Sequence, residues 1–166
     1  MLPILRVPDP CLRRVALPVG AVTDELRQLA ADMLETMYAA PGRGLAGPQI
    51  GVLRRIFVID TTWKEGARSP RVLIDPELIA ASEATHTGTE GCLSIPGLPV
   101  VVTRPAEITL RWTDLDGATR TEHLTGVEAV CAQHELDHLN GRLINDLMDE
   151  EARAAASPAL QAMARP

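Results

Sequence analysis

The 166-residue sequence has little of several features that define common protein classes. Only 2% of its residues are aromatic, so its core must be built mainly from Leu, Val, Ile and Ala. It has no basic run and a net charge of -6, which argues against a nucleic-acid-binding surface. No apolar stretch approaches the ~20 residues that cross a bilayer. The remaining usage, 46% apolar and 23% charged, predicts one globular domain.

Cysteine is also sparse, with single residues at positions 11, 92 and 131. The N-terminal segment has no charged n-region and prolines interrupt its apolar run, so it does not read as a secretory signal peptide. An odd number of cysteines without such a signal is a poor disulfide framework. We therefore expect a reduced, cytoplasmic protein, in which a cysteine with polar neighbours is a metal ligand or a nucleophile.

The hydrophobic pattern predicts a helix, several strands and a second helix. The first helix begins after Thr23, a good N-cap, and ends at Pro41-Gly42. Strands are expected over 54–60 and 71–75, followed by a hairpin over 107–124 that turns at Asp116-Gly117. This order favours an α+β fold over alternating strand–helix–strand units.

The second helix carries the most informative motif and precedes a different kind of segment. Thr125 and Glu128 fit a capping box at its start, and Asn140-Gly141 is a plausible stop. We assign residues 1–148 to the catalytic domain. The Ala-rich tail, 149–166, is expected to be a short helix or disordered.

Two of the four histidines stand four residues apart in the segment QHELDHLNG. On a helix, His134 and His138 then lie on one face, one turn apart, where two imidazoles can share a metal ion. Glu135 lies to one side, within reach of a water bound to that metal. The pattern is H-E-x-x-H, which alone indicates only a metal hydrolase and leaves the third ligand and the substrate open.

A catalytic metal site usually has three protein ligands. Cys131 shares the helix face, but at seven residues it lies about 10 Å from His138 along the axis. Ligands of one metal lie only about 3–4 Å apart, given metal–ligand bonds of about 2.0–2.3 Å. We therefore interpret Cys131 as a small buried apolar residue.

Other candidates for the third ligand are weaker than Cys92. The metzincin pattern would place a third histidine where Ile144 stands, which excludes that family. His86 and His123 are isolated in polar stretches and are expected at the surface. Cys92 follows a glycine that lets backbone approach closely, and we favour it as the ligand. Downstream carboxylates also exist, although nothing distinguishes one of them: Asp146, Asp149 and Glu150.

Three segments together strongly resemble the peptide deformylase family, whose members remove the formyl group from the initiator methionine of new polypeptides. They are GRGLAGPQ (42–49), EGCLS (90–94) and QHELDH (133–138), in this order and at family-like separations. The similarity extends to ILRVPDPCLR near the N-terminus and DLDG in the hairpin. It covers nearly the whole chain up to about Met148.

The resemblance implies roles at the metal. Cys92, His134 and His138 would bind one divalent ion, and Glu135 would be the general base and acid. Ferrous iron is the metal that the family implies, and zinc, nickel or cobalt also suit one thiolate with two imidazoles. The implied fold is α+β, with antiparallel sheets around a central helix that carries the H-E-x-x-H motif, and with an N-terminal helix.

The resemblance also implies how substrate is held. Gln49 and the backbone amide of Leu93 would stabilise the oxyanion, and the loop from Gly42 to Gly44 would run beside the substrate backbone. The implied substrate is a formylmethionyl peptide, and a transient contact with the ribosome is also expected. From the residues themselves, Val127, Val130 and Cys131 form either a methionine pocket or plain core. The candidate substrate-binding residues are Gly42, Arg43, Gly44, Gly91, Val127, Val130 and Cys131.

Some positions depart from the family pattern or suggest a supporting role. Arg43 stands where the family often has an aliphatic residue, and Gly47 replaces the usual alanine, which we expect to loosen the loop by ~1 kcal/mol. No basic residue follows Gly97 before Arg104, where the family commonly has one near the substrate. Asp137 is either exposed to solvent or an anchor for the metal site through Arg104.

Two other functions remain open at this point. One is a metal amidase of the same fold that acts on a different small N-acyl group or deformylates less efficiently. The other is a non-catalytic metal-binding module, which would need neither Glu135 nor Gln49. Both residues are present, so the sequence favours an enzyme.

Overall fold

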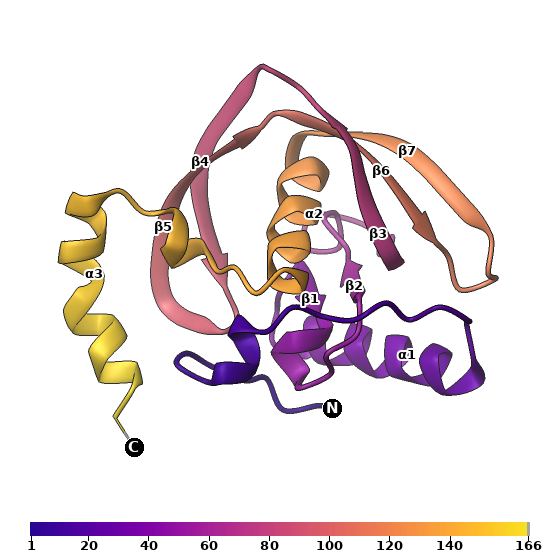
Figure 1. Cartoon of the computed structure of the whole chain (residues 1–166), viewed down its shortest axis with the longest axis horizontal. Coiled ribbons are helices and arrows are strands. Elements are labelled where there is room, and N and C mark those ends of the chain that lie inside the picture. Colours follow the sequence, from indigo (N-terminus) through magenta and orange to yellow (C-terminus); the bar gives the residue numbers. More distant parts are fainter. Residues whose placement is uncertain (166) are drawn as a thin grey trace.

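The computed structural model describes residues 1–165 and has the α+β architecture expected from the sequence. A five-stranded antiparallel sheet has the order β1-β2-β3-β6-β7, and β4 and β5 form a separate hairpin. Helix α2 lies between these two sheets (Figure 1). The helices are α1 (Asp24–Ala39), α2 (Gly126–Leu139) and α3 (Glu150–Met163). The strands are β1 (Gly44–Ala46), β2 (Ile56–Ile59), β3 (Arg71–Ala81), β4 (Thr85–Cys92), β5 (Ile95–Pro105), β6 (Glu107–Thr113) and β7 (Thr119–Thr125).

Helix α1 begins and ends as the sequence predicts. The Thr23 hydroxyl accepts a hydrogen bond from the amide of Leu26 at 3.2 Å, which caps the first turn. Its apolar face includes the fully buried Met33 and Met37, which belong to one cluster with residues of β1 and β2 such as Leu45. This packing fixes the position of the glycine-rich segment that follows the helix.

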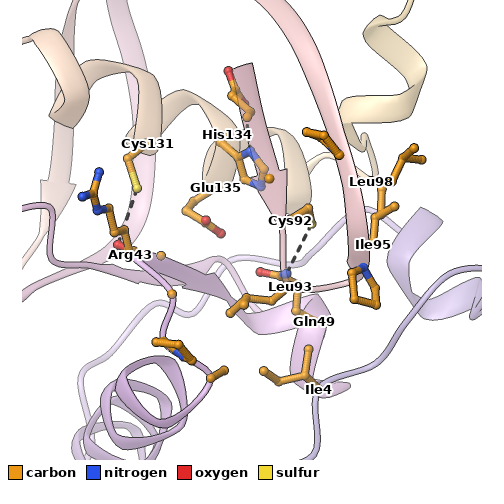
Figure 2. Close-up of a pocket in the computed structure, with 18 of the residues that line it drawn as sticks. Ile4, Arg43, Gln49, Cys92, Leu93, Ile95, Leu98, Cys131, His134 and Glu135 are labelled. Carbon is orange, nitrogen blue, oxygen red and sulfur yellow. Dashed lines mark hydrogen bonds and ion pairs between the residues drawn. The ribbon is translucent and has the colours of Figure 1, made fainter. Parts of the chain in front are cut away.

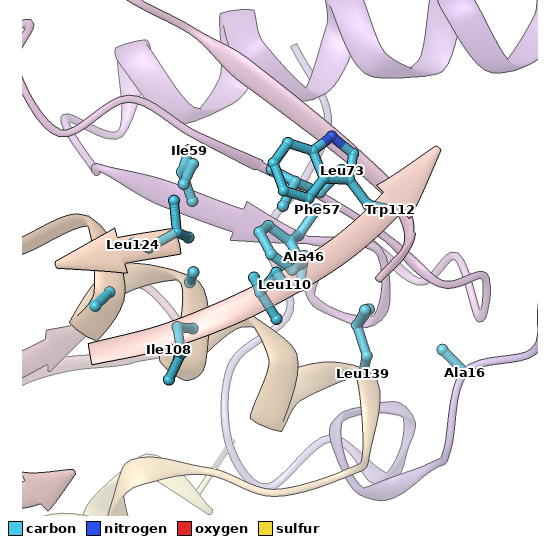
Figure 3. Packing of buried hydrophobic residues seen from close by; sticks show 12 residues of the cluster. Ala16, Ala46, Phe57, Ile59, Leu73, Ile108, Leu110, Trp112, Leu124 and Leu139 are labelled. Atoms are coloured by element: carbon cyan, nitrogen blue, oxygen red, sulfur yellow. The ribbon is translucent and has the colours of Figure 1, made fainter. Parts of the chain in front are cut away.

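Helix α2 is buried on the side that faces the five-stranded sheet. Ala129 and Ala132 are small enough to let the helix approach β6 closely, and they share a cluster with Leu110 and Trp112 (Figure 3). The helix ends at Leu139 as predicted. Gly141 follows it at φ 73, in the left-handed conformation typical of a glycine just past a helix.

The capping box predicted at the start of α2 does not form. Thr125 occupies the N-cap position without a side-chain hydrogen bond, and Gly126 follows it at φ 57. Glu128 instead pairs with Arg71 of β3 at 2.8 Å. The arginine competes for the carboxylate that a capping box would use, so this helix start is held by a contact from the sheet.

Strand β3 runs further than the five residues predicted. The expected strand stops at Asp75, just before Pro76, a residue that cannot donate a backbone hydrogen bond. The pairing with β6 shifts register between Ile74 and Glu77, and the strand then continues to Ala81. The bulge accommodates the proline, and the sequence gives no signal for it.

The tail forms a helix, one of the two alternatives for 149–166. The Asp149 side chain accepts from the amide of Ala152 at 2.7 Å and caps α3. Ala156 is buried in a cluster that contains Val102 of β5 and Ile144. The helix therefore packs on the outer side of the β4–β5 hairpin (Figure 1). Among the described residues, no helix is long and apolar enough to cross a membrane.

Candidate metal centre and substrate cavity

The buried face of α2 and the end of β4 bring three ligand atoms together. His134 and His138 lie one turn apart, with 3.3 Å between their Nε2 atoms. Cys92 ends β4, and its sulfur lies 3.4 Å from His138 Nε2. All three ligand atoms lie within 4.8 Å of one another. These separations match the spacing of about 3–4 Å that ligands around one divalent ion require.

The donor set fits a transition metal. One thiolate and two imidazoles suit iron, zinc, nickel or cobalt better than magnesium or calcium, which prefer oxygen ligands. His134 uses its Nδ1 to contact Glu90, which leaves its Nε2 for the metal. The other histidines, His86 and His123, lie on the surface as expected.

Glu135 projects from α2 into the cavity beside these ligands (Figure 2). It is 3% exposed, and its Oε2 has no hydrogen-bond partner among the described residues. Burial raises its pKa to about 7. Gly44 makes room for this side chain, since a Cβ there would lie 2.4 Å from Glu135 Oε1. The carboxylate is therefore close to the metal ligands and free to contact another molecule.

A buried ion-pair network supports His134 from behind. Glu90 accepts from His134 Nδ1 at 2.9 Å and from the Arg104 guanidinium through both of its oxygens, at 2.7 and 2.9 Å. Arg104 also pairs with Asp137 at 2.9 Å, which is the contact expected if Asp137 supports the metal site. Burial alone would raise the pKa of Glu90, but the hydrogen bonds from His134 and Arg104 lower it to about 2.

Gln49 is held with its amide nitrogen toward the metal ligands. Its Oε1 accepts from the amide of Ala46 at 3.0 Å, which fixes the orientation of the side chain. Its Nε2 then lies 3.1 Å from Ser94 Oγ and 3.8 Å from the Cys92 sulfur (Figure 2). Leu93, the residue after Cys92, also lines the cavity. The donor that the sequence suggested is therefore next to the metal centre.

A cavity of about 790 Å³ opens beside these groups. Val127 lines it and is 56% exposed, so this residue forms the rim and is not plain core. Cys131 lies outside the metal-ligand group, as expected, and its thiol donates to the carbonyl of Arg43 at 3.5 Å. All seven candidate substrate-binding residues line the cavity: Gly42, Arg43, Gly44, Gly91, Val127, Val130 and Cys131.

The positions that depart from the family pattern have local explanations. Arg43 forms an ion pair with Glu65. A Cβ at Gly47 would lie 2.6 Å from the carbonyl oxygen of Val52, so the backbone packs closely against this glycine, and the expected loosening of the loop stays a prediction. The cavity does contain basic residues, although none follows Gly97 directly. Two of them, Arg6 and Lys64, come from other parts of the chain.

Comparison with known proteins decides the family. Residues 1–154 match the family model described as polypeptide deformylase. A peptide deformylase from Rhizorhabdus wittichii is 53% identical over 148 residues, which cover 86% of this chain and 84% of that protein. One from Alkalilimnicola ehrlichii is 48% identical over 165 residues, covering 99% of this chain and 92% of the relative. The chain belongs to the peptide deformylase family.

Solved deformylase structures share this fold over nearly the whole chain. A peptide deformylase from Plasmodium falciparum superposes with a TM-score of 0.93 at 32% identity and covers 98% of this chain and 95% of its own. One from Synechococcus elongatus, in complex with actinonin, gives 0.89 at 38% identity over 95% of this chain and 86% of its own. As a deformylase, the chain is a hydrolase of formylated nascent peptides, as the sequence predicts.

Glu90 is the deformylase residue that sequence reasoning missed. It is the first residue of EGCLS, two positions before Cys92, and its sequence position alone predicts no role. The available signal was weak: an acidic residue beside a metal-binding motif, in a strand that would have to pass the histidine helix. Only the placement of β4 against α2 brings its carboxylate to His134.

Proposed function

We propose that this chain deformylates peptides with one divalent metal ion held by Cys92, His134 and His138. The observation that carries the proposal is the meeting of the three ligand atoms within 4.8 Å, beside a buried glutamate that faces the cavity. A metal-binding module would need the first feature alone. The glutamate and the oriented Gln49 support hydrolysis.

Glu135 moves the proton in this mechanism. A divalent metal, when bound, polarises the formyl carbonyl and lowers the pKa of a water molecule. Glu135 accepts the proton of the attacking water and later donates it to the leaving amine of the methionine. Its unpartnered Oε2 is available for that transfer. The products are formate and a peptide with a free amino terminus.

Gln49 and the backbone amide of Leu93 stabilise the charge that develops on the formyl oxygen. The Gln49 amide is fixed by the Ala46 amide and does not need to reorganise during the reaction. A donor preorganised in this way typically lowers the barrier by about 3–4 kcal/mol in a dry site. Because Gln49 is uncharged, it does not bind the ground state as tightly as a cation would.

The substrate backbone lies between β1 and the end of β4. Strand β1 is an edge strand of its sheet, and Gly44 and Gly91 line the cavity from the two sides. An extended peptide can add beside such an edge through main-chain hydrogen bonds. The methionine side chain then occupies the pocket at Val127, Val130 and Cys131.

The identity of the metal and the cellular setting belong to the same proposal. We assign Fe²⁺, with Zn²⁺, Ni²⁺ and Co²⁺ as ions that the same ligands accept. We also propose that the reaction occurs in the cytoplasm, in transient contact with the ribosome, because the substrate is a nascent peptide. Metal analysis of anaerobically purified protein, with a formylmethionyl-peptide assay on the same sample, tests the assignment. The iron-loaded enzyme should lose activity in air because the sulfur of its thiolate ligand oxidises.

Glu135→Ala tests the mechanism. We expect the purified variant to keep its metal, since Glu135 is not a ligand, and to lose turnover by at least about 100-fold, the lower end for a positioned acid–base group. Metal analysis and formate release are measured on one preparation. Near-normal turnover in the metal-loaded variant would show that the proposed proton transfer is wrong.

The alternative function is hydrolysis of a different small N-acyl group, or deformylation at reduced efficiency. Arg43 beside the pocket is the observation that favours it, because it is charged where the family often has an aliphatic residue. Formyl- and acetyl-methionyl peptides assayed side by side distinguish the two. A larger kcat/KM for the acetyl peptide would replace deformylation with this alternative.

A further inference from the structure

The loop that joins β2 to β3 packs against the substrate cavity through an aromatic contact. The Trp63 indole donates a hydrogen bond to the carbonyl of Gly42 at 2.9 Å. The Trp63 ring meets the Tyr38 ring edge to face, with centroids 5.2 Å apart and an interplanar angle of 82°. The chain has only four Phe, Tyr and Trp residues, and two of them, Tyr38 and Trp63, form this contact.

A buried carboxylate fixes the base of this loop. Asp60 is 1% exposed and accepts from the Tyr38 hydroxyl at 2.6 Å and from the backbone amide of Ser69 at 2.9 Å. The Arg68 guanidinium lies 4.0 Å from the centre of the Tyr38 ring. The two ends of the loop are therefore tied to each other and to helix α1, so Trp63 is presented on a fixed support.

The same loop reaches the next residues of the cavity wall. Glu65 forms an ion pair with Arg43, and Lys64 lines the cavity. The backbone amide of Asp60 donates to the carbonyl of Arg43 at 2.9 Å. Gly42 and Arg43 are thus both held by the loop, immediately before the edge strand β1.

Gly42 also packs against the side chain of Leu93. A Cβ at Gly42 would lie 2.7 Å from Leu93 Cδ1, so the two residues are already in close contact. A shift of Gly42 would move the end of the Leu93 side chain or the start of β1. The wall of the substrate groove therefore depends on what holds the Gly42 carbonyl.

We propose that Trp63 is a positioning residue for peptide binding, which holds the Gly42–Gly44 segment at the place where the substrate backbone lies. The proposal rests on the proposed function. Among the described residues, Trp63 makes its hydrogen bond to Gly42 and its ring contact to Tyr38 and does not line the cavity itself, so its effect falls on the binding of the peptide beyond methionine. A substrate that ends at methionine does not extend along this segment and should not depend on Trp63.

Trp63→Phe tests the proposal because it keeps a ring against Tyr38 and removes the indole N–H. We expect KM for a formylmethionyl tripeptide to rise about fivefold, the effect of one lost hydrogen bond. The value of kcat, the metal content and the kinetics with formylmethionine amide should change less than about twofold. Trp112→Phe is the matched control, since Trp112 packs in the core cluster and does not line the cavity.

The outcomes separate this inference from the proposed function. Failure of the parent enzyme to deformylate either substrate would overturn the function. Activity in the parent with an unchanged tripeptide KM in Trp63→Phe would overturn the inference, as would an equal change for both substrates. If Trp63→Phe does not fold, Trp112→Phe leaves Trp63 as the single tryptophan. Its fluorescence should then change when the deformylated tripeptide binds, and no change at saturation overturns the proposal.

Discussion

Glu90 links the candidate metal centre to a buried cation. One of its oxygens orients His134, and both contact Arg104, whose side chain is 6% exposed. A buried guanidinium is stable only while its charge is compensated, so the carboxylate serves the arginine and the histidine at once. Asp137 supplies the remaining compensation from the next turn of α2. Metal binding and local stability should therefore be coupled through this one side chain.

Glu90→Gln tests that coupling. The amide can still accept from His134, but it no longer offsets the charge of Arg104. We expect metal affinity to fall by about 10-fold to 100-fold, as is typical when a group that orients a ligand is changed. Titration with Zn²⁺ against a competing chelator gives the affinity. Glu77→Gln is the control, because Glu77 also pairs with an arginine but does so on the surface. Equal affinities for Glu90→Gln and the control would contradict the prediction.

For single residues, the sequence predicts contacts between near neighbours in the chain better than contacts between distant positions. The spacing of His134 and His138 determines their proximity as soon as a helix forms. Cys92 was favoured because weaker candidates could be excluded by reach and because of its motif. Glu90 has no such signal, since its contact with His134 spans 44 positions and depends on how a hairpin meets a helix.

At the level of elements, the edge strand β1 and helix α2 approach each other at Gly44. The Glu135 carboxylate occupies the space that the missing side chain of Gly44 leaves, since Glu135 Oε1 lies 2.4 Å from where a Cβ of residue 44 would be. The atom that would be displaced is the end of a flexible side chain. A side chain at position 44 should therefore move the base without unfolding the protein.

Gly44→Ala should lower kcat by about 100-fold, the effect of misplacing a catalytic group by about 1 Å. The free energy of unfolding should change by less than about 1 kcal/mol, as for a substitution that only displaces an adaptable group. Gly66→Ala, in the loop before β3, is the control because a Cβ there meets only Thr62 O at 3.8 Å. Full activity of Gly44→Ala would mean that the base tolerates the displacement.

Asp60 joins α1 to the end of β2 and gives the protein a defined acid sensitivity. Burial alone would raise its pKa, but hydrogen bonds from Tyr38 and from backbone amides, including that of Ser69, lower it. A carboxyl whose pKa is lower in the folded state stabilises the fold above its unfolded pKa. That stabilisation is lost as the pH falls through the folded value.

Asp60→Asn should therefore make the free energy of unfolding fall less steeply as the pH is lowered. Between pH 6 and pH 3, the parent should lose more unfolding free energy than the variant does, by up to about 1 kcal/mol, which is the most that one carboxyl with an ordinary unfolded pKa can contribute above pH 3. Urea unfolding at each pH measures the difference. Parallel pH profiles for the two proteins would show that Asp60 does not titrate as expected.

Elements were predictable where their signals are local. Thr23 caps α1 through an amide three residues away, and Gly141 terminates α2 by its own conformation. Thr125 is the N-cap of α2 as predicted, but the capping box does not form because Arg71, 57 positions away, pairs with its glutamate. The length of β3 was wrong because its partner strand accepts a bulge at Pro76. In both cases, a contact with a residue far away in the sequence decided the structure in place of the local preference.

At the scale of the whole molecule, the cavity lies between two sheets and α3 lies outside them. The residues that line the cavity come from the N-terminal segment, β1, the β4–β5 hairpin and α2, together with neighbouring loops. The described residues of α3 supply none of them. Its contribution is to cover the outer face of the hairpin, where Ala156 is buried against a cluster that includes Ile144 and Val100. The tail should therefore affect stability without affecting turnover.

A pair of substitutions in α3 tests this separation. Ala155 and Ala156 are neighbours on one helix, and only Ala156 is buried. Ala156→Asp places an unpaired charge against an apolar cluster and should lower the free energy of unfolding by about 2 kcal/mol or more. Ala155→Asp makes the same chemical change in solvent and should stay within about 0.5 kcal/mol of the parent. Because no cavity residue comes from α3, kcat/KM below the unfolding transition should be unchanged in both variants. A loss of kcat/KM in folded Ala156→Asp would mean that α3 supports the active site through the β4–β5 hairpin, and that the boundary at residue 148 does not separate a catalytic domain from a tail.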